Sequence, residues 1–80
     1  MSGEMQLCRA EIGGEYTVGS INLRKDTARR LEMLGMTKGT RIKVLGAKRS
    51  GPMIVKVRGT RFAVGKSFTE GIYIRKSGGI

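Results

Sequence analysis

The chain of 80 residues has no histidine and no tryptophan, and it has only one cysteine and one proline. Without histidine it lacks both the commonest general base and the commonest metal ligand. The lone Cys8 can form neither a thiolate zinc site nor an intramolecular disulfide. The six acidic residues are dispersed, and no spacing brings several carboxylates together around a hard cation. We therefore expect no enzymatic activity, no cofactor, no metal site and no small-molecule substrate.

Long apolar runs are also missing. The first residues, MSGEMQLCR, contain no apolar core of the kind that a signal peptide needs. No run elsewhere approaches the roughly 20 apolar residues that a membrane-spanning helix requires. We therefore expect a cytoplasmic protein.

Glycine, by contrast, is frequent, and thirteen glycines separate short runs rich in Ile, Val, Leu and Met. Such residues favour half-buried strands, and the glycines supply turns between them. Strands are predicted at 15–22, 40–46, 52–58, 61–64 and 72–75, with one helix at 26–34 and a helical turn at 66–70. Met5 and Leu7 can add an edge strand. The sequence thus predicts a single all-β domain over residues 1–80, a small, partly open barrel of five or six strands with one short helix. Its core is expected at about 13–75, with flexible ends.

Three local features are predicted within these strands. Gly19 interrupts the alternation of its strand, which indicates a bulge or a bend. The alternation of strand 40–46 places Gly46 on the same side as its apolar residues. Gly59 and Thr60 are predicted to form the tight turn of a hairpin.

The segment Ala28 to Gly39, ARRLEMLGMTKG, has the most distinctive pattern in the chain. Asp26 or Thr27 is expected to cap the start of its helix. Apolar residues at helical spacing predict a narrow buried face: Ala28, Leu31 and Leu34. Gly35 follows at the position of a left-handed C-cap, and Gly39 is expected to turn the chain into the next strand. We interpret these features as architecture, a helix that caps the barrel.

The net charge is +10, from sixteen basic and six acidic residues. Such an excess favours an acidic partner, which can be nucleic acid, an anionic membrane surface or an acidic protein face. The candidate partner-binding residues form two groups. The helix group is Arg29 and Arg30, and the sheet group is Arg41, Lys43, Lys56 and Arg58. Like charges opposite each other on a sheet are mildly destabilising, so an acidic cover would explain the sheet group. The alternative is that their stems cover apolar surface while their charged heads stay in water.

The few aromatic residues argue against nucleic acid as the partner. Single-stranded nucleic acid is usually bound by stacking on exposed rings. Tyr16 and Phe62 fall at inward positions of their strands, and Phe68 is expected to close one end of the barrel. No recognition helix or RNA-binding signature is visible.

Four successive motifs, ARRLEMLGMTKG, RIKVLG, GPMIVKVRGTRFAV and KSFTEGIYI, resemble in order and spacing the FeoA family of small ferrous iron transport proteins. The resemblance covers about residues 13 to 75. Lys38 departs from the family pattern, in which proline is common before Gly39. The residues that carry the structural motif are these: Leu31, Leu34, Gly35, Gly39, Gly51 and Pro52.

The resemblance implies an SH3-like β-barrel with a part in transition metal ion homeostasis. It implies an accessory protein at the cytoplasmic face of FeoB, the membrane GTPase that takes up ferrous iron, and hence a cytoplasmic location that can be peripheral to the inner membrane. An alternative is a basic SH3-like barrel that acts as a regulatory module, similar to the barrel of iron-dependent repressors, or as a nucleic-acid-binding module. Charge alone would also suit a membrane-surface or ribosome-associated adaptor.

Overall fold

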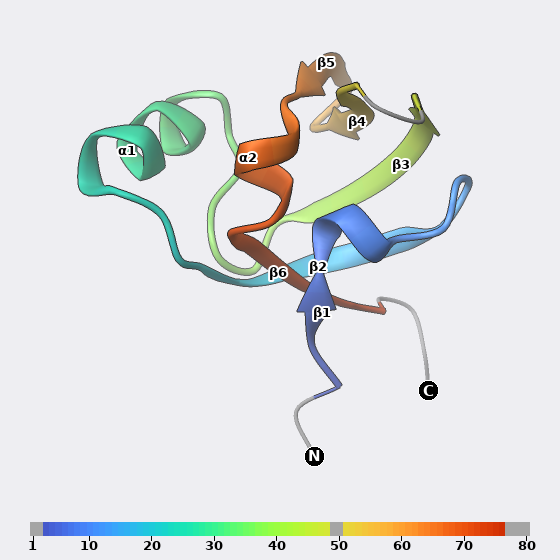
Figure 1. Ribbon diagram of the computed structural model, residues 1–80, viewed down its shortest axis with the longest axis horizontal. Helices are drawn as coiled ribbons and strands as arrows, with labels where there is room; N and C mark the ends of the chain where they lie inside the picture. The colour runs from blue at the N-terminus through green and yellow to red at the C-terminus, as the bar shows by residue number, and fades with distance from the viewer. Residues whose placement is uncertain (1–2, 49–50, 77–80) are drawn as a thin grey trace.

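The computed structural model describes residues 3–48 and 51–76, which form one antiparallel sheet with three short helical segments (Figure 1). In the sheet the strands follow the order β1-β6-β2-β3-β4-β5. The strands are β1 (Met5–Gln6), β2 (Glu15–Ile21), β3 (Arg41–Ala47), β4 (Met53–Val57), β5 (Thr60–Val64) and β6 (Ile72–Lys76). The helical segments are η1 (Leu7–Arg9), α1 (Lys25–Met33) and α2 (Lys66–Thr69). The predicted barrel with one short helix is thereby confirmed. The tail beyond Lys76, predicted to be flexible, lies outside the described residues.

The core is built from one face of each strand. Ile42 and Val44 of β3 are buried, and Val55 and Val57 of β4 lie opposite them in register. This burial follows from the alternation of apolar and polar residues, since successive side chains of a strand point to opposite faces. Leu7 is also fully buried, upstream of the core expected at 13–75, because η1 turns it inward from the edge strand.

Two irregularities bend the sheet. The register between β2 and β6 shifts between Val18 and Ser20, which confirms the bulge predicted at Gly19. A second shift lies between Val44 and Gly46, in the pairing of β3 with β4. The simple alternation predicted through Gly46 therefore stops at this shift. Bulges of this kind increase local twist, which helps a short sheet to curl around its core.

Helix α1 ends in a Schellman motif. The amide of Met36 donates to the carbonyl of Leu31 at 2.9 Å, and the amide of Gly35 donates to the carbonyl of Glu32 at 2.9 Å. Gly35 has φ of 95°, the left-handed conformation expected at this position. Leu31 and Met36 are both buried, as the apolar contact of the motif requires.

Two predictions for this helix are wrong. The N-cap residue is Arg24, and its side chain makes no capping hydrogen bond, although Asp26 does accept a hydrogen bond from the first-turn amide of Thr27. Leu34, expected on the buried face, is the C-cap residue and is 54% exposed. The chain reverses after Leu34, so Met36 occupies the place beside Leu31 that periodicity assigned to Leu34.

The hairpin between β4 and β5 is displaced by one residue from its prediction. Arg58 and Gly59 form its centre with φ of 52° and 84°, and Thr60 already pairs with Val57. Positive φ at both central residues is the signature of a type I′ turn, whose twist matches the flanking strands. Phe68 does not close the barrel as predicted, since it is 38% exposed.

Candidate functional site

Two rows of charged residues cross the outer face of the sheet. In the first row, Glu15 of β2 pairs with Lys43 of β3, and Lys43 pairs with Lys56 of β4. Lys56 in turn pairs with Arg61 of β5. Paired residues of antiparallel strands lie on the same face with their Cβ atoms about 5 Å apart. The sheet therefore holds three cations and one carboxylate side by side across four strands.

The second row runs parallel to the first. Thr17 of β2 pairs with Arg75 of β6 on one side and with Arg41 of β3 on the other. Arg58 follows β4 directly, where the register continues from the pair Ile42 and Val57. We call the two rows together the basic sheet face, and its charged members are Glu15, Arg41, Lys43, Lys56, Arg58, Arg61 and Arg75. All seven are exposed.

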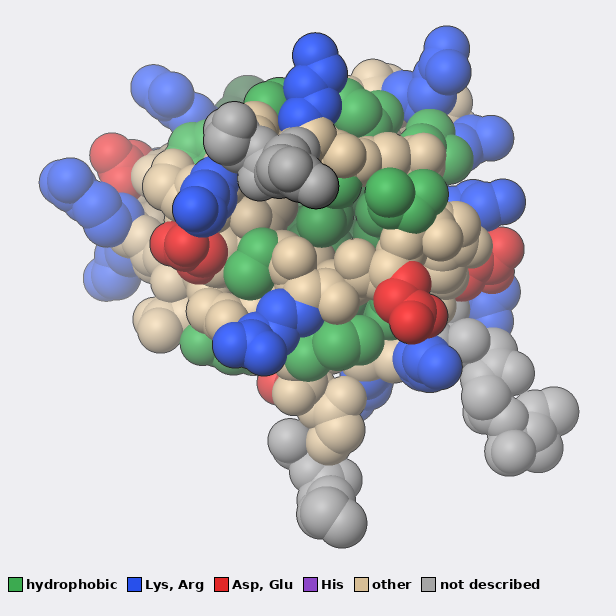
Figure 2. Space-filling model, turned by 45° about the vertical axis from the view of Figure 1, so that its right-hand side comes forward, with side chains coloured by type: hydrophobic (Ala, Val, Ile, Leu, Met, Phe, Trp, Pro, Cys, Tyr) green, Lys and Arg blue, Asp and Glu red, His purple; other side chains and the backbone are tan. Residues whose placement is uncertain are grey.

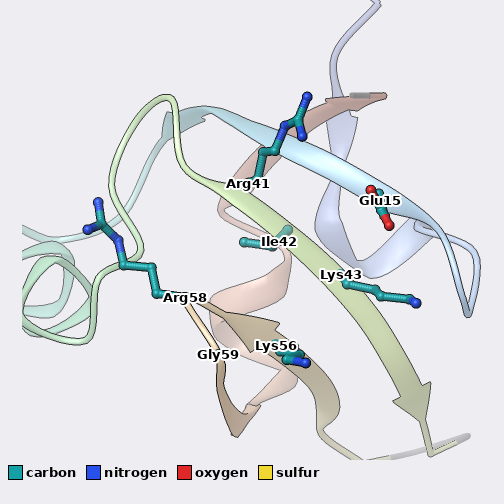
Figure 3. Close-up of a pocket in the computed structure, with 7 residues that line it drawn as sticks. All are labelled: Glu15, Arg41, Ile42, Lys43, Lys56, Arg58 and Gly59. Atoms are coloured by element: carbon teal, nitrogen blue, oxygen red, sulfur yellow. The ribbon is translucent and has the colours of Figure 1, made fainter. Parts of the chain in front are cut away.

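A shallow hollow of about 180 Å³ lies in this face, lined by Glu15, Arg41, Ile42, Lys43, Lys56, Arg58 and Gly59 (Figure 3). Figure 3 shows that the charged ends of Arg41, Lys43 and Arg58 point apart rather than toward one centre. A small ligand is normally enclosed in a deep pocket, whereas this hollow is shallow and open to solvent and four cations line it. The arrangement suits contact with an extended anionic surface instead.

Arg58 holds a special position in the hollow. It is the one residue other than glycine with positive φ in the described part of the chain. Its side chain reaches the end of α1, where a Cβ built on Gly35 would lie 3.2 Å from its Cδ. Arg58 therefore joins the basic sheet face to the C-terminus of α1.

The structure gathers the predicted sheet group of basic residues around one hollow, but it places the helix group elsewhere. Arg41, Lys43, Lys56 and Arg58 of the sheet group line one hollow. Arg29 and Arg30 lie exposed on α1, which forms one end of the long axis of the molecule (Figure 1). Elsewhere the charge is widely distributed, and Figure 2 shows Lys and Arg side chains projecting around most of the outline. The exposed side of α1 is therefore a second basic surface of the molecule.

The structural motif residues take mainly backbone roles. Gly35 and Gly39 both have positive φ, of 95° and 91°. Gly51 donates its amide to the carbonyl of Lys48 at 3.2 Å, and Pro52 accepts from the amide of Lys48 at 3.3 Å. These contacts hold the chain where it enters β4.

Sequence reasoning missed Arg61 and Arg75. Each is exposed and has one less exposed apolar neighbour in its strand, Phe62 for Arg61 and Ile74 for Arg75, so the sequence carried a signal for both. Arg61 joins the first row through the β4–β5 hairpin, whereas Arg75 joins the second row because β6 pairs with β2 across more than fifty residues of sequence. Alternation alone does not give such pairing.

The described residues also limit the chemistry of the chain. Within 3–48 and 51–76, no three His, Cys, Asp or Glu residues are grouped to hold a metal ion. Across the same residues, no helix is long and apolar enough to cross a membrane. The basic sheet face offers ammonium and guanidinium donors, which bind carboxylates and phosphates.

Comparison with known proteins agrees with this fold. The FeoA domain matches residues 5–76. A crystal structure of an iron uptake regulatory protein (FeoA) is 32% identical and superposes with a TM-score of 0.82, over 91% of this chain and 96% of that chain. The solution structure of FeoA protein from Chlorobium tepidum is 28% identical, with a TM-score of 0.86 over 95% of this chain and 73% of that chain.

A manganese-dependent transcriptional repressor shares the fold, with 19% identity and a TM-score of 0.87 over 95% of this chain and 43% of its own. Comparison with curated protein sequences gives no match. The domain match and the identity to a solved FeoA protein show that this chain belongs to the FeoA domain family, a family of SH3-like proteins associated with ferrous iron transport.

Proposed function

We propose that this protein is a non-enzymatic accessory protein of ferrous iron uptake that binds and modulates FeoB, the membrane GTPase transporter, at its cytoplasmic face. Membership of the FeoA domain family supports the link to iron transport. The basic sheet face carries the proposal of binding, since it concentrates six cations and one carboxylate on one exposed surface.

The energetics of this face favour a bound partner. Lys56 lies between Lys43 and Arg61, and like charges directly opposite each other destabilise a sheet. An acidic surface laid over the rows would remove this repulsion and gain charge-assisted hydrogen bonds. Complementary charge of this kind mainly speeds association and selects the partner. We infer that an acidic region of the transporter covers the face.

A nucleic-acid-binding module is the alternative function. The repressor with the same fold shows that this barrel also occurs within a larger regulator. On the basic sheet face, however, few rings are available for stacking, since Tyr16 is buried, Phe62 packs partly against the core, and Tyr73, which lies two residues before Arg75, is half-buried. The alternative to be tested is therefore that the basic sheet face binds the phosphates of duplex DNA.

The test is co-purification of the full chain with a FeoB-type transporter. The variant Arg41→Glu/Lys43→Glu/Lys56→Glu/Arg58→Glu should lose most of the transporter that the unmodified chain retains. The matched control reverses four exposed cations outside the face: Arg9→Glu/Lys38→Glu/Lys48→Glu/Lys66→Glu. Both variants carry the same net charge, so a difference between them reports on location.

If the first variant still retains the transporter, the basic sheet face is not the surface that binds it. Failure of the unmodified chain to retain it, together with salt-sensitive binding to duplex DNA, would favour the alternative.

A further inference from the structure

We propose that the outer face of α1 docks on an anionic membrane surface through Met33 and the arginines beside it. Met33 is 82% exposed and Leu34 is 54% exposed, so two neighbouring large apolar side chains project from the end of one helix. Neither is required to fill the core. This surface shares no residue with the basic sheet face, although Arg58 of that face reaches the end of α1, and the inference stands independently of transporter binding.

Helix geometry places Met33 among cations. Successive residues of an α-helix are about 100° apart, so Met33 points about 200° away from the buried Leu31. Residues three and four positions apart are neighbours on a helix surface. Arg29 and Arg30 are therefore the neighbours of Met33 in the preceding turn, and Lys25 continues the line through Arg29.

The outer face of α1 suits a membrane by its charge. Lys25, Arg29 and Arg30 are exposed there with two acidic neighbours, Asp26 and Glu32, so cations outnumber carboxylates by three to two. Anionic lipid attracts basic residues near its surface, and a helix with basic and apolar residues on its exposed side can lie at the headgroup level. Arginine stems also contribute apolar area while their guanidinium groups reach the phosphates.

The shape of the surface also favours lipid over a peptide. Helix α1 forms one end of the long axis of the molecule and stands beside the sheet (Figure 1). A peptide ligand is usually held in a groove, whereas a convex tip can insert a side chain between headgroups. One methionine with a few cations gives weak, reversible binding, as expected when a single apolar group acts with a basic patch.

Tryptophan fluorescence provides a direct test, because the chain contains no tryptophan. The full-length variant Met33→Trp is mixed with vesicles of phosphatidylglycerol and phosphatidylethanolamine, or with phosphatidylcholine vesicles, at about 0.1 M salt, where screening acts over about 10 Å. We expect a blue shift with the anionic vesicles alone. The matched control is Ile12→Trp, since Ile12 is 62% exposed in the turn before β2, away from α1 (Figure 1), and its emission should not move.

Vesicle flotation then measures the contribution of each group in the tryptophan-free chain. Met33→Ser should lower the partition coefficient by about fivefold to tenfold, since a buried methionine side chain is lost from the interface. Arg29→Gln/Arg30→Gln should lower it by about tenfold or more. The control Lys48→Gln/Lys66→Gln removes the same charge elsewhere and should have a smaller effect.

Three outcomes would overturn the proposal. The unmodified chain can fail to float with anionic vesicles. It can float while Met33→Trp gives no blue shift, which would assign lipid contact to another face. It can form a dimer without lipid that Met33→Ser abolishes, which would make a second copy the occupant of this helix face.

Discussion

Arg58 lies over Gly35, and both residues adopt positive φ, of 52° and 95°. The turn of the β4–β5 hairpin and the end of α1 thus meet where each has a left-handed residue. A Cβ on residue 35 would come within 3.2 Å of the Arg58 Cδ and 3.8 Å of the Val57 Cγ1. This contact joins the two surfaces proposed for binding.

Gly35→Ala should lower the free energy of unfolding by about 1–2 kcal/mol in urea denaturation. The main cause is the left-handed conformation, which costs an L-residue with a Cβ about that amount. The Arg58 side chain is flexible and can move aside, so the contact adds little. Gly46→Ala is the control, because Gly46 has no positive φ and a Cβ at this position would meet nothing within 4 Å, and it should change stability by less than about 0.5 kcal/mol. If the two variants are equally stable, residue 35 does not adopt the left-handed conformation that the prediction assumes.

Arg58→Asn should raise the free energy of unfolding by up to about 1 kcal/mol while weakening partner binding. Asparagine tolerates left-handed backbone better than arginine, and Asn-Gly is favoured in type I′ turns. The control Arg61→Asn removes the same charge from the neighbouring strand, where asparagine is unfavourable, and should be neutral or destabilising. A loss of stability in Arg58→Asn would indicate that the packing of the arginine stem outweighs the backbone preference.

Met36→Ala and Met33→Ala make the same chemical change at opposite extremes of burial. Met36 is fully buried in the Schellman motif, and its truncation should cost about 2–4 kcal/mol of unfolding free energy. Met33 is 82% exposed, and its truncation should cost less than about 0.5 kcal/mol. Urea denaturation measures both. A large cost at Met33 would mean that it supports the fold and would weaken the case for a docking role.

Strand alternation predicted most of the fold because the apolar residues that face the core recur at every second position of their strands. Ile42 and Val44 of β3 lie on the core side as expected, and the glycine at position 19 marked its bulge. The errors fell where tertiary structure decides. Periodicity could not show that the chain reverses after Leu34 and buries Met36 in its place. It also placed the hairpin turn one residue late, because arginine is not a residue that sequence patterns assign to positive φ.

The sequence predicted only part of the basic sheet face, again because tertiary structure decides which strands pair. Arg41, Lys43 and Lys56 belong to the consecutive strands β3 and β4, Arg58 follows β4 directly, and their pairing follows from one short connection. Arg75 lies beside Thr17 only because β6 returns to pair with β2. Such long-range register depends on how the whole sheet is assembled, and local patterns do not encode it.

The charge rows make a last prediction, on Lys56→Glu. Lys56 faces Lys43 on one side and Arg61 on the other, so glutamate converts two like-charge pairs into two opposite-charge pairs. Each cross-strand pair contributes about 0.2–1 kcal/mol, so the free energy of unfolding should rise by about 1 kcal/mol at low salt. The gain should shrink as sodium chloride is added, because exposed charges are screened. Lys38→Glu makes the same change of net charge at an exposed loop position without a cross-strand partner in the described sheet, and it should gain less. If both variants gain equally in urea denaturation, the repulsion belongs to the molecule as a whole, and the local strain that argues for an acidic cover on the basic sheet face is absent.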